Sequence, residues 1–296
     1  MAKLKILTRW VLWCSLGIGL GSGRAVAQPP LADASTPVAY EHIVRRDPNY
    51  SIHILKIDLK DPRVSVHVSR GGPDPDGDGP WLTTLMPTSE IAEREKYDLA
   101  INGDFFDAQA TKDIEGKNTG YVRGKAAAPV GMAMTGGVLW HRAASARPYL
   151  EITDAKVARV VAGEVPVDGA AREVVGGGQI IVRDGRAVPF TGAFATNRHP
   201  RTVAGIDASG TRLTILVVDG RQPQLSIGMT LAELSDEMVR LGCSAAINLD
   251  GGGSTTLVYR TPENKKLTIV NSPSDTKERS VADVLGVTFD GALPKL

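Results

Sequence analysis

The sequence predicts an α+β fold in which a few helices pack against a large mixed or antiparallel sheet. Most of the chain consists of short runs in which apolar and polar residues alternate, separated by Gly, Pro, Asp and Asn, and this pattern is typical of strands joined by turns. Only two segments have the apolar spacing of a helix, and each runs directly into a buried strand. Many short strands combined with few helices indicate the α+β class.

Length and charge restrict the function classes. With 296 residues, of which 42% are hydrophobic, the chain can bury a sizeable core, and we predict a single domain over residues 40–296. The 34 basic and 33 acidic residues leave a net charge of +1. This balance provides no basic field for nucleic acid or an anionic membrane, so we expect no nucleic-acid partner.

Residues 1–27 have the pattern of a signal peptide. A basic start precedes a short apolar run, and the small residues that follow suit cleavage after Ala27. An uncleaved anchor is the alternative, but the apolar run is shorter than the roughly 20 residues that cross a bilayer. We therefore expect a secreted or periplasmic protein with no membrane span after cleavage, and a flexible lead-in over residues 28–39.

Cysteine chemistry is limited to one residue. Cys14 lies in the predicted signal, so the mature chain keeps Cys243 alone and cannot form an internal disulfide. Cys243 falls between a helix pattern and an apolar strand, which favours a buried core thiol. A nucleophilic role would need a nearby base, and the local sequence supplies none.

The first strong strand patterns are residues 51–59 and 63–70. Apolar residues occupy alternate positions in both, and the short "KDP" segment between them has turn chemistry. We expect the two strands to pair with each other.

Residues 71–80 are an acidic, glycine-rich interruption. Asp74, Asp76 and Asp78 match the opening of a calcium-binding EF-hand loop, but its twelfth position is Leu85 rather than a glutamate. Calcium is the one cofactor that the sequence suggests, and a solvated acidic turn is the alternative at these three residues.

Two segments each predict a helix followed by a buried strand, over residues 88–102 and 230–248. The second carries the stronger signals, because Thr230 and Glu233 form a capping box before an apolar stripe and Gly242 follows the helix. Both segments end in a strand, an asparagine, one further residue and an aspartate. This similarity suggests an internal duplication of a helix and strand unit, with a chance match as the alternative.

The remaining patterns are strands and turns. They cover residues 130–140, 146–161, 176–188, 202–221, 255–271 and 280–289, and "DASG" closes a hairpin in the fourth.

Candidate functional side chains gather where these strands end. They are Asn102, Asp104, Arg198, His199, Arg201, Asp219, Arg221, Asn248 and Asp250. Each has an ordinary structural explanation alone, since "DG" is a common turn and asparagine often caps a loop. Together they suggest a site that rigid strands present to solvent.

The run "DGGGST" after Asn248 is the most distinctive of these strand ends. Gly251, Gly252 and Gly253 permit positive φ and leave N–H groups unshielded, so with the hydroxyl of Ser254 they suit an anion-binding concavity. A phosphate-binding P-loop is excluded because no lysine follows and the next residues have strand character.

Two common chemistries lack support in the sequence. No GxSxG motif is present, and the five histidines have no zinc spacing. His199 stands out because it lies between two arginines, and it is a substrate-binding candidate. The set that remains, carboxylates with arginines and exposed N–H groups, suits the cleavage of a bond next to an anionic group.

Five motifs extend this interpretation: "INGDFF", "HPRTVAGID", "LVVDGR", "GMTLAELSDEMVRLGCSAAINLDGGGSTTLV" and "NSPSDTKERSVADVLGV". Together they resemble the phosphodiester glycosidase domain family, in family order, from about residue 50 to about residue 289. The resemblance implies removal of a sugar from a sugar-1-phosphodiester, which gives free sugar and a phosphomonoester. Because that leaving group is already acidic, stabilising its charge matters more than protonating it.

The resemblance also implies roles for residues at the matching positions. The carboxylate candidates for nucleophile, base or oxocarbenium stabilisation are Asp250, Asp219, Asp104 and Glu278. The candidates for phosphate contact are Arg201, Arg221 and Arg279. Asn102 and Asn248 would bind sugar hydroxyls or orient the acids, and the three glycines would let the ligand approach.

We therefore predict an exported glycosidase that acts on a glycosyl phosphodiester in an envelope glycan or exopolysaccharide. Two other functions would use the same residues. One is a glycan-binding or polysaccharide-assembly protein without turnover, and the other is a metal-dependent phosphodiesterase that cuts the P–O bond.

Overall fold

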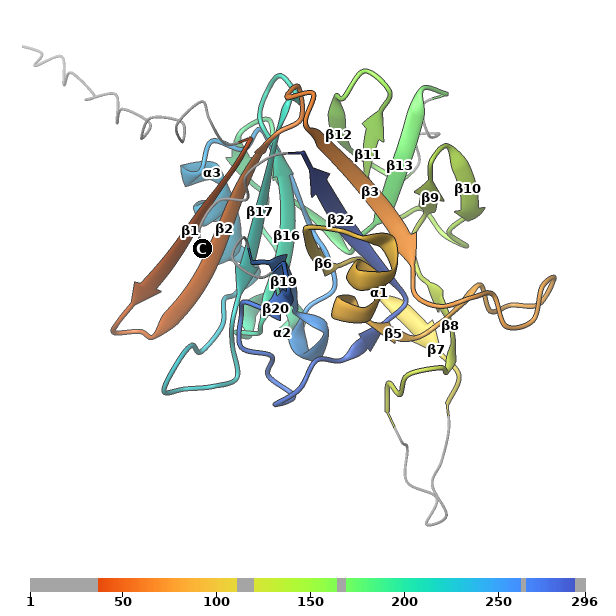
Figure 1. Cartoon of the computed structure of the whole chain (residues 1–296). Coiled ribbons are helices and arrows are strands. Elements are labelled where there is room, and N and C mark those ends of the chain that lie inside the picture. The colour runs from red at the N-terminus through yellow and green to blue at the C-terminus, as the bar shows by residue number, and fades with distance from the viewer. Residues whose placement is uncertain (1–36, 111–119, 164–168, 262–264, 291–296) are drawn as a thin grey trace, which may run out of the picture. The chain divides into compact units, whose positions relative to one another are not determined.

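Seven antiparallel strands form the largest sheet, called the large sheet below (Figure 1). The computed structural model describes residues 37–110, 120–163, 169–261 and 265–290. In spatial order the strands of the large sheet are β1 (Val38–Arg45), β2 (Tyr50–Asp58), β17 (Arg212–Val218), β16 (Arg201–Ile206), β18 (Ala245–Asn248), β14 (Gln179–Arg183) and β15 (Arg186–Ala187).

Two five-stranded antiparallel sheets complete most of the fold. The second sheet has the order β20 (Leu267–Ile269), β19 (Leu257–Arg260), β6 (Leu99–Asn102), β22 (Asp283–Phe289) and β3 (Val64–Arg70). The third sheet has the order β10 (Val138–His141), β9 (Ala133–Thr135), β13 (Ala171–Gly176), β11 (Tyr149–Thr153) and β12 (Ala158–Val161). Smaller pairings join β4 (Thr83–Thr84), β8 (Ala126–Pro129) and β7 (Phe106–Ala108), and separately β21 (Ser280–Val281) and β5 (Met86–Pro87).

The main core lies between the large and second sheets. Alternation within each strand directs one set of apolar side chains into this space, including Leu55 and Ile215 from the large sheet and Ile101 and Leu285 from the second. The intervening residues face outward, yet most are buried as well, because helices cover the outer faces. Strands buried on both faces explain why these runs are so apolar.

Each long helix covers the outer face of one sheet. The helix α3 (Leu231–Arg240) packs Leu234 and Met238 on the large sheet, and α1 (Thr88–Glu95) packs Ile91 on the second sheet. The predicted capping box of α3 is present, and Gly242 follows with φ of +85°. A short helix, α2 (Ala193–Thr196), and a 3₁₀ turn, η1 (Gly252–Ser254), complete the set within the described residues.

The predicted α+β class is confirmed, with antiparallel pairing throughout the sheets described above. Cys243 is buried in the cluster between α3 and the large sheet, as predicted, and burial raises the pKa of its thiol to about 11. The strand β1 begins at Val38, so the end of the predicted lead-in belongs to the sheet. The predicted signal peptide lies outside the described residues. No helix in the part of the chain that is described has the length and apolarity to cross a membrane.

The predicted pairing of residues 51–59 with 63–70 is wrong. β2 pairs with β1 and β17 in the large sheet, whereas β3 pairs with β22 in the second sheet. The Asp61 side chain accepts a 2.9 Å hydrogen bond from the Arg63 N–H, which fixes a turn that carries the chain from one sheet to the other. Alternation shows that a strand forms, but it does not identify the partner.

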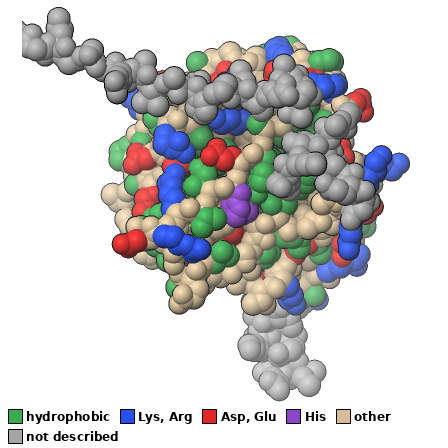
Figure 2. All heavy atoms as spheres, turned by 60° about the vertical axis from the view of Figure 1, so that its left-hand side comes forward, with side chains coloured by type: hydrophobic (Ala, Val, Ile, Leu, Met, Phe, Trp, Pro, Cys, Tyr) green, Lys and Arg blue, Asp and Glu red, His purple; other side chains and the backbone are tan. Residues whose placement is uncertain are grey.

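The two predicted helix and strand units both form, as α1 with β6 and α3 with β18. They belong to different sheets, and the predicted duplication is not confirmed. Figure 2 shows the face near β1 and β2, where basic and acidic side chains are interspersed, as expected for a net charge of +1.

Candidate active site

The ends of β6 and β18 meet, although the two strands belong to different sheets. The side-chain amide of Asn102 donates a 2.7 Å hydrogen bond to the carbonyl oxygen of Asp250, and the Asp250 N–H donates to the carbonyl oxygen of Gly103 at 3.0 Å. The Asn102 side-chain oxygen accepts from the Thr202 hydroxyl at 2.8 Å. Asn102 is fully buried, so it fixes the backbone of the acid rather than facing a ligand.

Glycines allow a close approach of protein groups to the loop after Asp250. A Cβ on Gly251 would lie 2.7 Å from the carbonyl oxygen of Pro200, and one on Gly253 would lie 2.0 Å from Nη2 of Arg279. Gly252 has φ of +61°, and a Cβ there would lie 3.1 Å from Nη2 of Arg221. The space that the missing side chains leave is therefore taken by two arginines, where the sequence suggested a ligand.

Asp250 lies partly exposed at this junction. Its Oδ1 accepts a 2.7 Å hydrogen bond from the Gly251 N–H. Burial raises the pKa of Asp250 to about 6, while the Ser254 hydroxyl, the Gly251 N–H and the charges of Arg279 and Arg221 act in the opposite direction. A carboxyl with this pKa changes its protonation close to neutral pH, as a catalytic acid or base must.

Arg221 and Arg279 approach the glycine loop from separate segments. Arg221 has φ of +58°, and its Nη2 lies 3.3 Å from Nδ1 of His199. Because a guanidinium can only donate, Nδ1 of His199 accepts this hydrogen bond. Burial, followed by the charges of Arg201 and Arg221, lowers the pKa of His199. Arg279 donates from Nε and Nη2 to the Asp275 carboxylate at 3.0 and 2.7 Å.

Arg201 is buried behind the site, with 1% of its surface exposed. Its guanidinium donates to the carbonyl oxygens of Met229, Phe194 and Asn197, and lies 4.7 Å from the centre of the Phe194 ring. Burial and then the charge of Arg221 lower the pKa of Arg201 to about 10. Its geometry supports a contribution to the positive field of the site and offers no direct phosphate contact.

Asp104 lies next to a second acid, Asp283, that the sequence analysis missed. Both carboxyls are almost fully buried, and the Asp104 N–H donates to Oδ1 of Asp283 at 2.8 Å. Burial raises the pKa of Asp283 to about 7, with a smaller contribution from Asp250, and burial together with Asp283 raises the pKa of Asp104 well above its usual range. Glycines make room for the pair, because a Cβ on Gly176 would lie 2.5 Å from Oδ2 of Asp104.

Asp219 is held in a hydrogen-bond network at the edge of the core. Its Oδ1 accepts from the Ser272 N–H at 2.8 Å and from the Asn271 side chain at 3.1 Å. Its Oδ2 accepts from the Ser51 hydroxyl at 2.8 Å and lies 3.4 Å from Nε2 of His53. Because protein groups occupy both oxygens, this geometry supports a positioning role for the loop at 271–272.

Asn248 lies near the site with an unused acceptor. Its amide donates to the Gln179 side chain at 3.2 Å, whereas Oδ1 is buried without a hydrogen bond to any described residue. The hydroxyls of Thr255 and Thr256 and Oδ2 of Asp283 share this condition within the described part of the chain. Unpaired buried polar atoms are typical of places that bind water or a ligand.

Glu278 lies away from Asp250. Its carboxylate accepts from the N–H and the hydroxyl of Ser89, at 2.7 and 2.6 Å, in the first turn of α1. Burial raises the pKa of Glu278. Its carboxylate therefore satisfies donors at the start of α1.

The acidic loop over residues 71–80 is separate from these groups. The Asp74 carboxylate accepts from the N–H groups of Asp76 and Gly77, and Asp76 accepts from the Trp81 N–H. No three His, Cys, Asp or Glu side chains of the described residues lie close enough to hold a metal ion. The hydrogen bonds of Asp74 and Asp76 are those of an acidic turn, and calcium binding in this loop stays a prediction.

Asp283 had one weak signal in the sequence. It is the single acid in the apolar run "SVADVLGV", and an acid in a strand that is buried on both faces has no ordinary structural purpose. The run has the pattern of an ordinary final strand, because its residues do not show that other elements cover both of its faces.

The sequence of the chain places it in a known class. Residues 95–288 match the sequence model of the phosphodiester glycosidase family, and the chain belongs to this family. Membership supports hydrolysis of the phosphodiester glycosidase type and a glycan-type substrate.

Three solved structures share the fold. The catalytic domain of zebrafish N-acetylglucosamine-1-phosphodiester alpha-N-acetylglucosaminidase, auto-inhibited by its pro-peptide, matches at 20% identity and a TM-score of 0.60, over 86% of this chain and 82% of that chain. A putative exported protein from Burkholderia pseudomallei matches at 18% identity and a TM-score of 0.57, over 81% of this chain and 74% of that chain. A hypothetical protein from Synechocystis matches at 13% identity and a TM-score of 0.55, over 86% of this chain and 62% of that chain.

One curated relative is similar in sequence. The SPbeta prophage-derived uncharacterized protein YomE of Bacillus subtilis is 33% identical over 134 residues, which are 44% of this chain. The match spans only 20% of the length of that relative.

Proposed function

We propose that this chain hydrolyses the glycosidic bond of a sugar-1-phosphodiester and releases free sugar and a phosphomonoester. The observation that carries the proposal is the placement of Asp250, a half-buried acid with a pKa of about 6, beside a glycine loop that both Arg221 and Arg279 approach. A site with one titrating acid beside two cations suits a substrate that carries an anion next to the bond to be broken.

The two arginines would hold the phosphate and stabilise the charge that develops on it as the C1–O bond breaks. A phosphomonoester is a good leaving group, so the reaction needs little general-acid help. Asp250 in its ionised form would act on the sugar side, as base, as nucleophile, or by stabilising the oxocarbenium-like transition state. The Asp104 and Asp283 pair lies behind it and would tune its charge without contacting the substrate.

The natural substrate would be an envelope glycan or exopolysaccharide, with the protein secreted or periplasmic. This part of the proposal is supported by the signal-like composition of residues 1–27 and by the net charge of +1, which suits neither nucleic acid nor an anionic membrane.

The decisive experiment screens the purified protein against sugar-1-phosphodiesters and ordinary aryl glycosides, with and without chelator, in ¹⁸O-labelled water. The phosphomonoester is then analysed by mass spectrometry, because the anomeric oxygen of a free sugar exchanges with water while a phosphate oxygen does not. Unlabelled phosphomonoester is expected, since the C1–O bond breaks. Label in the phosphate would identify a P–O-cleaving phosphodiesterase, and no release from any phosphodiester would leave a glycan-binding role.

A further inference from the structure

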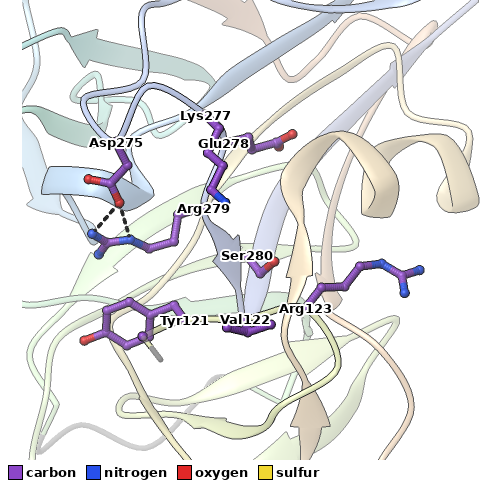
Figure 3. A pocket seen from close by; sticks show the side chains of 9 residues that line it. Tyr121, Val122, Arg123, Asp275, Lys277, Glu278, Arg279 and Ser280 are labelled. Carbon is purple, nitrogen blue, oxygen red and sulfur yellow. Dashed lines mark hydrogen bonds and ion pairs between the residues drawn. The ribbon is translucent and has the colours of Figure 1, made fainter. Parts of the chain in front are cut away.

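A cavity of about 550 Å³ opens between two segments that are distant in the sequence (Figure 3). Residues 120–123 form one side, and residues 275–280 form the other. The volume lies within the range of about 300–1,000 Å³ that is usual for small-molecule sites. None of the roles proposed above involves this cavity.

Arg279 connects the cavity to Asp250. Its guanidinium lines the cavity and is bound to Asp275, as Figure 3 shows. The same guanidinium lies against the backbone of Gly253, three residues after Asp250 in the chain. A phosphate held by Arg279 would therefore lie next to both the glycine loop that follows Asp250 and the cavity.

Tyr121 provides an aromatic surface in the cavity. The Arg279 guanidinium lies 4.7 Å from the centre of the Tyr121 ring, and Phe106 packs edge to face against it at 5.2 Å. These contacts fix the ring, yet 47% of the Tyr121 surface stays exposed. A fixed, exposed aromatic ring with a polar tip suits the apolar face of a sugar.

Most charged side chains of the cavity already have partners. Asp275 binds Arg279, Glu278 binds Ser89, and Arg123 binds Glu90 at 2.6 Å. Lys277 is exposed and has no ion pair with any described residue. Lys277 therefore supplies the cavity with a positive charge that no described side chain neutralises.

We propose that this cavity is the subsite for the aglycone, in which a second sugar packs on Tyr121 and an anionic group of the same glycan binds Lys277. The inference rests on the proposed function and defines its substrate class as an anionic glycan chain. A short alkyl aglycone would leave the cavity empty.

The test compares three aglycones on α-glucose 1-phosphate and on α-N-acetylglucosamine 1-phosphate: methanol, glucose through O6, and glucose 1-phosphate through O6. We expect kcat/KM to rise from the first aglycone to the third. In Tyr121→Ala the ratio of kcat/KM for the glucose diester to that for the methyl diester should fall about tenfold, whereas Tyr121→Phe should keep it. In Lys277→Gln the ratio for the glucose 1-phosphate diester to the glucose diester should fall about fivefold.

Arg186→Gln is the matched control, since it removes one exposed positive charge at the β14–β15 hairpin, remote from the β14 residue that pairs with Asn248. It should leave both ratios unchanged. Equal kcat/KM for all three aglycones in the wild-type protein, or unchanged ratios in Tyr121→Ala and Lys277→Gln, would overturn the subsite while leaving the glycosidase function standing.

A binding measurement separates the subsite from turnover. By calorimetry, glucose 1,6-bisphosphate should bind at least tenfold more tightly than methyl phosphate, and Tyr121→Ala and Lys277→Gln should each reduce this difference. Equal affinity of the wild-type protein for the two phosphates would contradict the subsite even if no diester is turned over.

Discussion

The backbone N–H of Asp104 donates a 2.8 Å hydrogen bond to Oδ1 of Asp283, which places two buried acids from different segments side by side. Two ionised carboxylates in such a place would repel each other without solvent to screen them. Burial raises the pKa of both acids, so the pair holds its protons to higher pH in the folded protein than two solvated carboxyls would.

This pair makes stability depend on pH in a direction opposite to ordinary acid denaturation. The unfolded Asp283 releases its proton near pH 4, whereas the folded residue has a pKa of about 7, so the folded state is favoured at low pH and loses this advantage as pH rises to about 7. The wild-type protein should lose this contribution between pH 4 and pH 8, whereas Asp283→Asn has no proton to lose. The free energy of unfolding of the variant minus that of the wild type should therefore increase by more than about 1.4 kcal/mol over this range. Urea unfolding at both pH values measures it, with the exposed Asp236→Asn as the control. A difference that does not change with pH would contradict the raised pKa.

Asp250→Asn tests the central acid. Loss of the carboxylate should reduce kcat by at least about a thousandfold, because a nucleophile or base cannot be replaced by an amide. Substrate affinity should change little, since Arg221 and Arg279 remain, and calorimetry with an intact phosphodiester measures it. Asp236→Asn again serves as the control. Retained turnover in a folded Asp250→Asn protein would remove this residue from the mechanism.

Arg221→Gln tests the link between the phosphate site and Asp250. The positive charge of Arg221 lowers the pKa of Asp250, so its removal should raise that pKa. In the wild-type protein kcat/KM should fall below about pH 6 as Asp250 is protonated, and in Arg221→Gln this acid limb should move to higher pH. The affinity for inorganic phosphate should also fall about tenfold, as expected for the loss of one charge-assisted hydrogen bond. A pH profile of unchanged shape would show that the limb belongs to another group, and Arg186→Gln controls for net charge.

Asp219→Ala tests a residue that the structure places in a supporting network. The change would leave the Ser51 hydroxyl, the Asn271 amide and the Ser272 N–H without their buried acceptor, which should reduce the free energy of unfolding by about 2–4 kcal/mol. In the milder Asp219→Asn, kcat of the folded protein should remain within about tenfold of wild type. A loss of a thousandfold in a folded Asp219→Asn protein would instead place Asp219 among the catalytic groups.

Local patterns predicted the elements of this fold and the hairpin of β16 with β17, but not the partners of strands that are distant in the sequence. The capping box, the glycine after α3 and the strands ending at Asn102 and Asn248 all form, because each signal depends on neighbouring residues. β3 pairs with β22, in a different sheet from β2. The sequence does not show this, because the alternation in β3 is compatible with any strand that has the same alternation.

The sequence predicted those parts of the candidate site that lie in the recognised motifs near strand ends. Asp250, Arg221 and Arg279 come together as the motifs suggested. Asp283 could not be recognised, since its burial depends on a sheet assembled from five distant strands. Glu278 faces α1 because the rotation of a loop side chain depends on which donors the fold brings within reach.

The hydrogen bond between Asn102 and Asp250 spans 148 residues of chain. Contacts of such long sequence separation close large loops and form late, so folding dominated by them is slow. During synthesis, 148 further residues must be added after Asn102 before its partner Asp250 is complete. The pairings of β2 with β17 and of β3 with β22 span still more of the chain, so a refolding protein should recover its helices first, and its sheets together with the geometry around Asp250 only late. The geometry around Asp250 therefore reports whether the whole topology is complete.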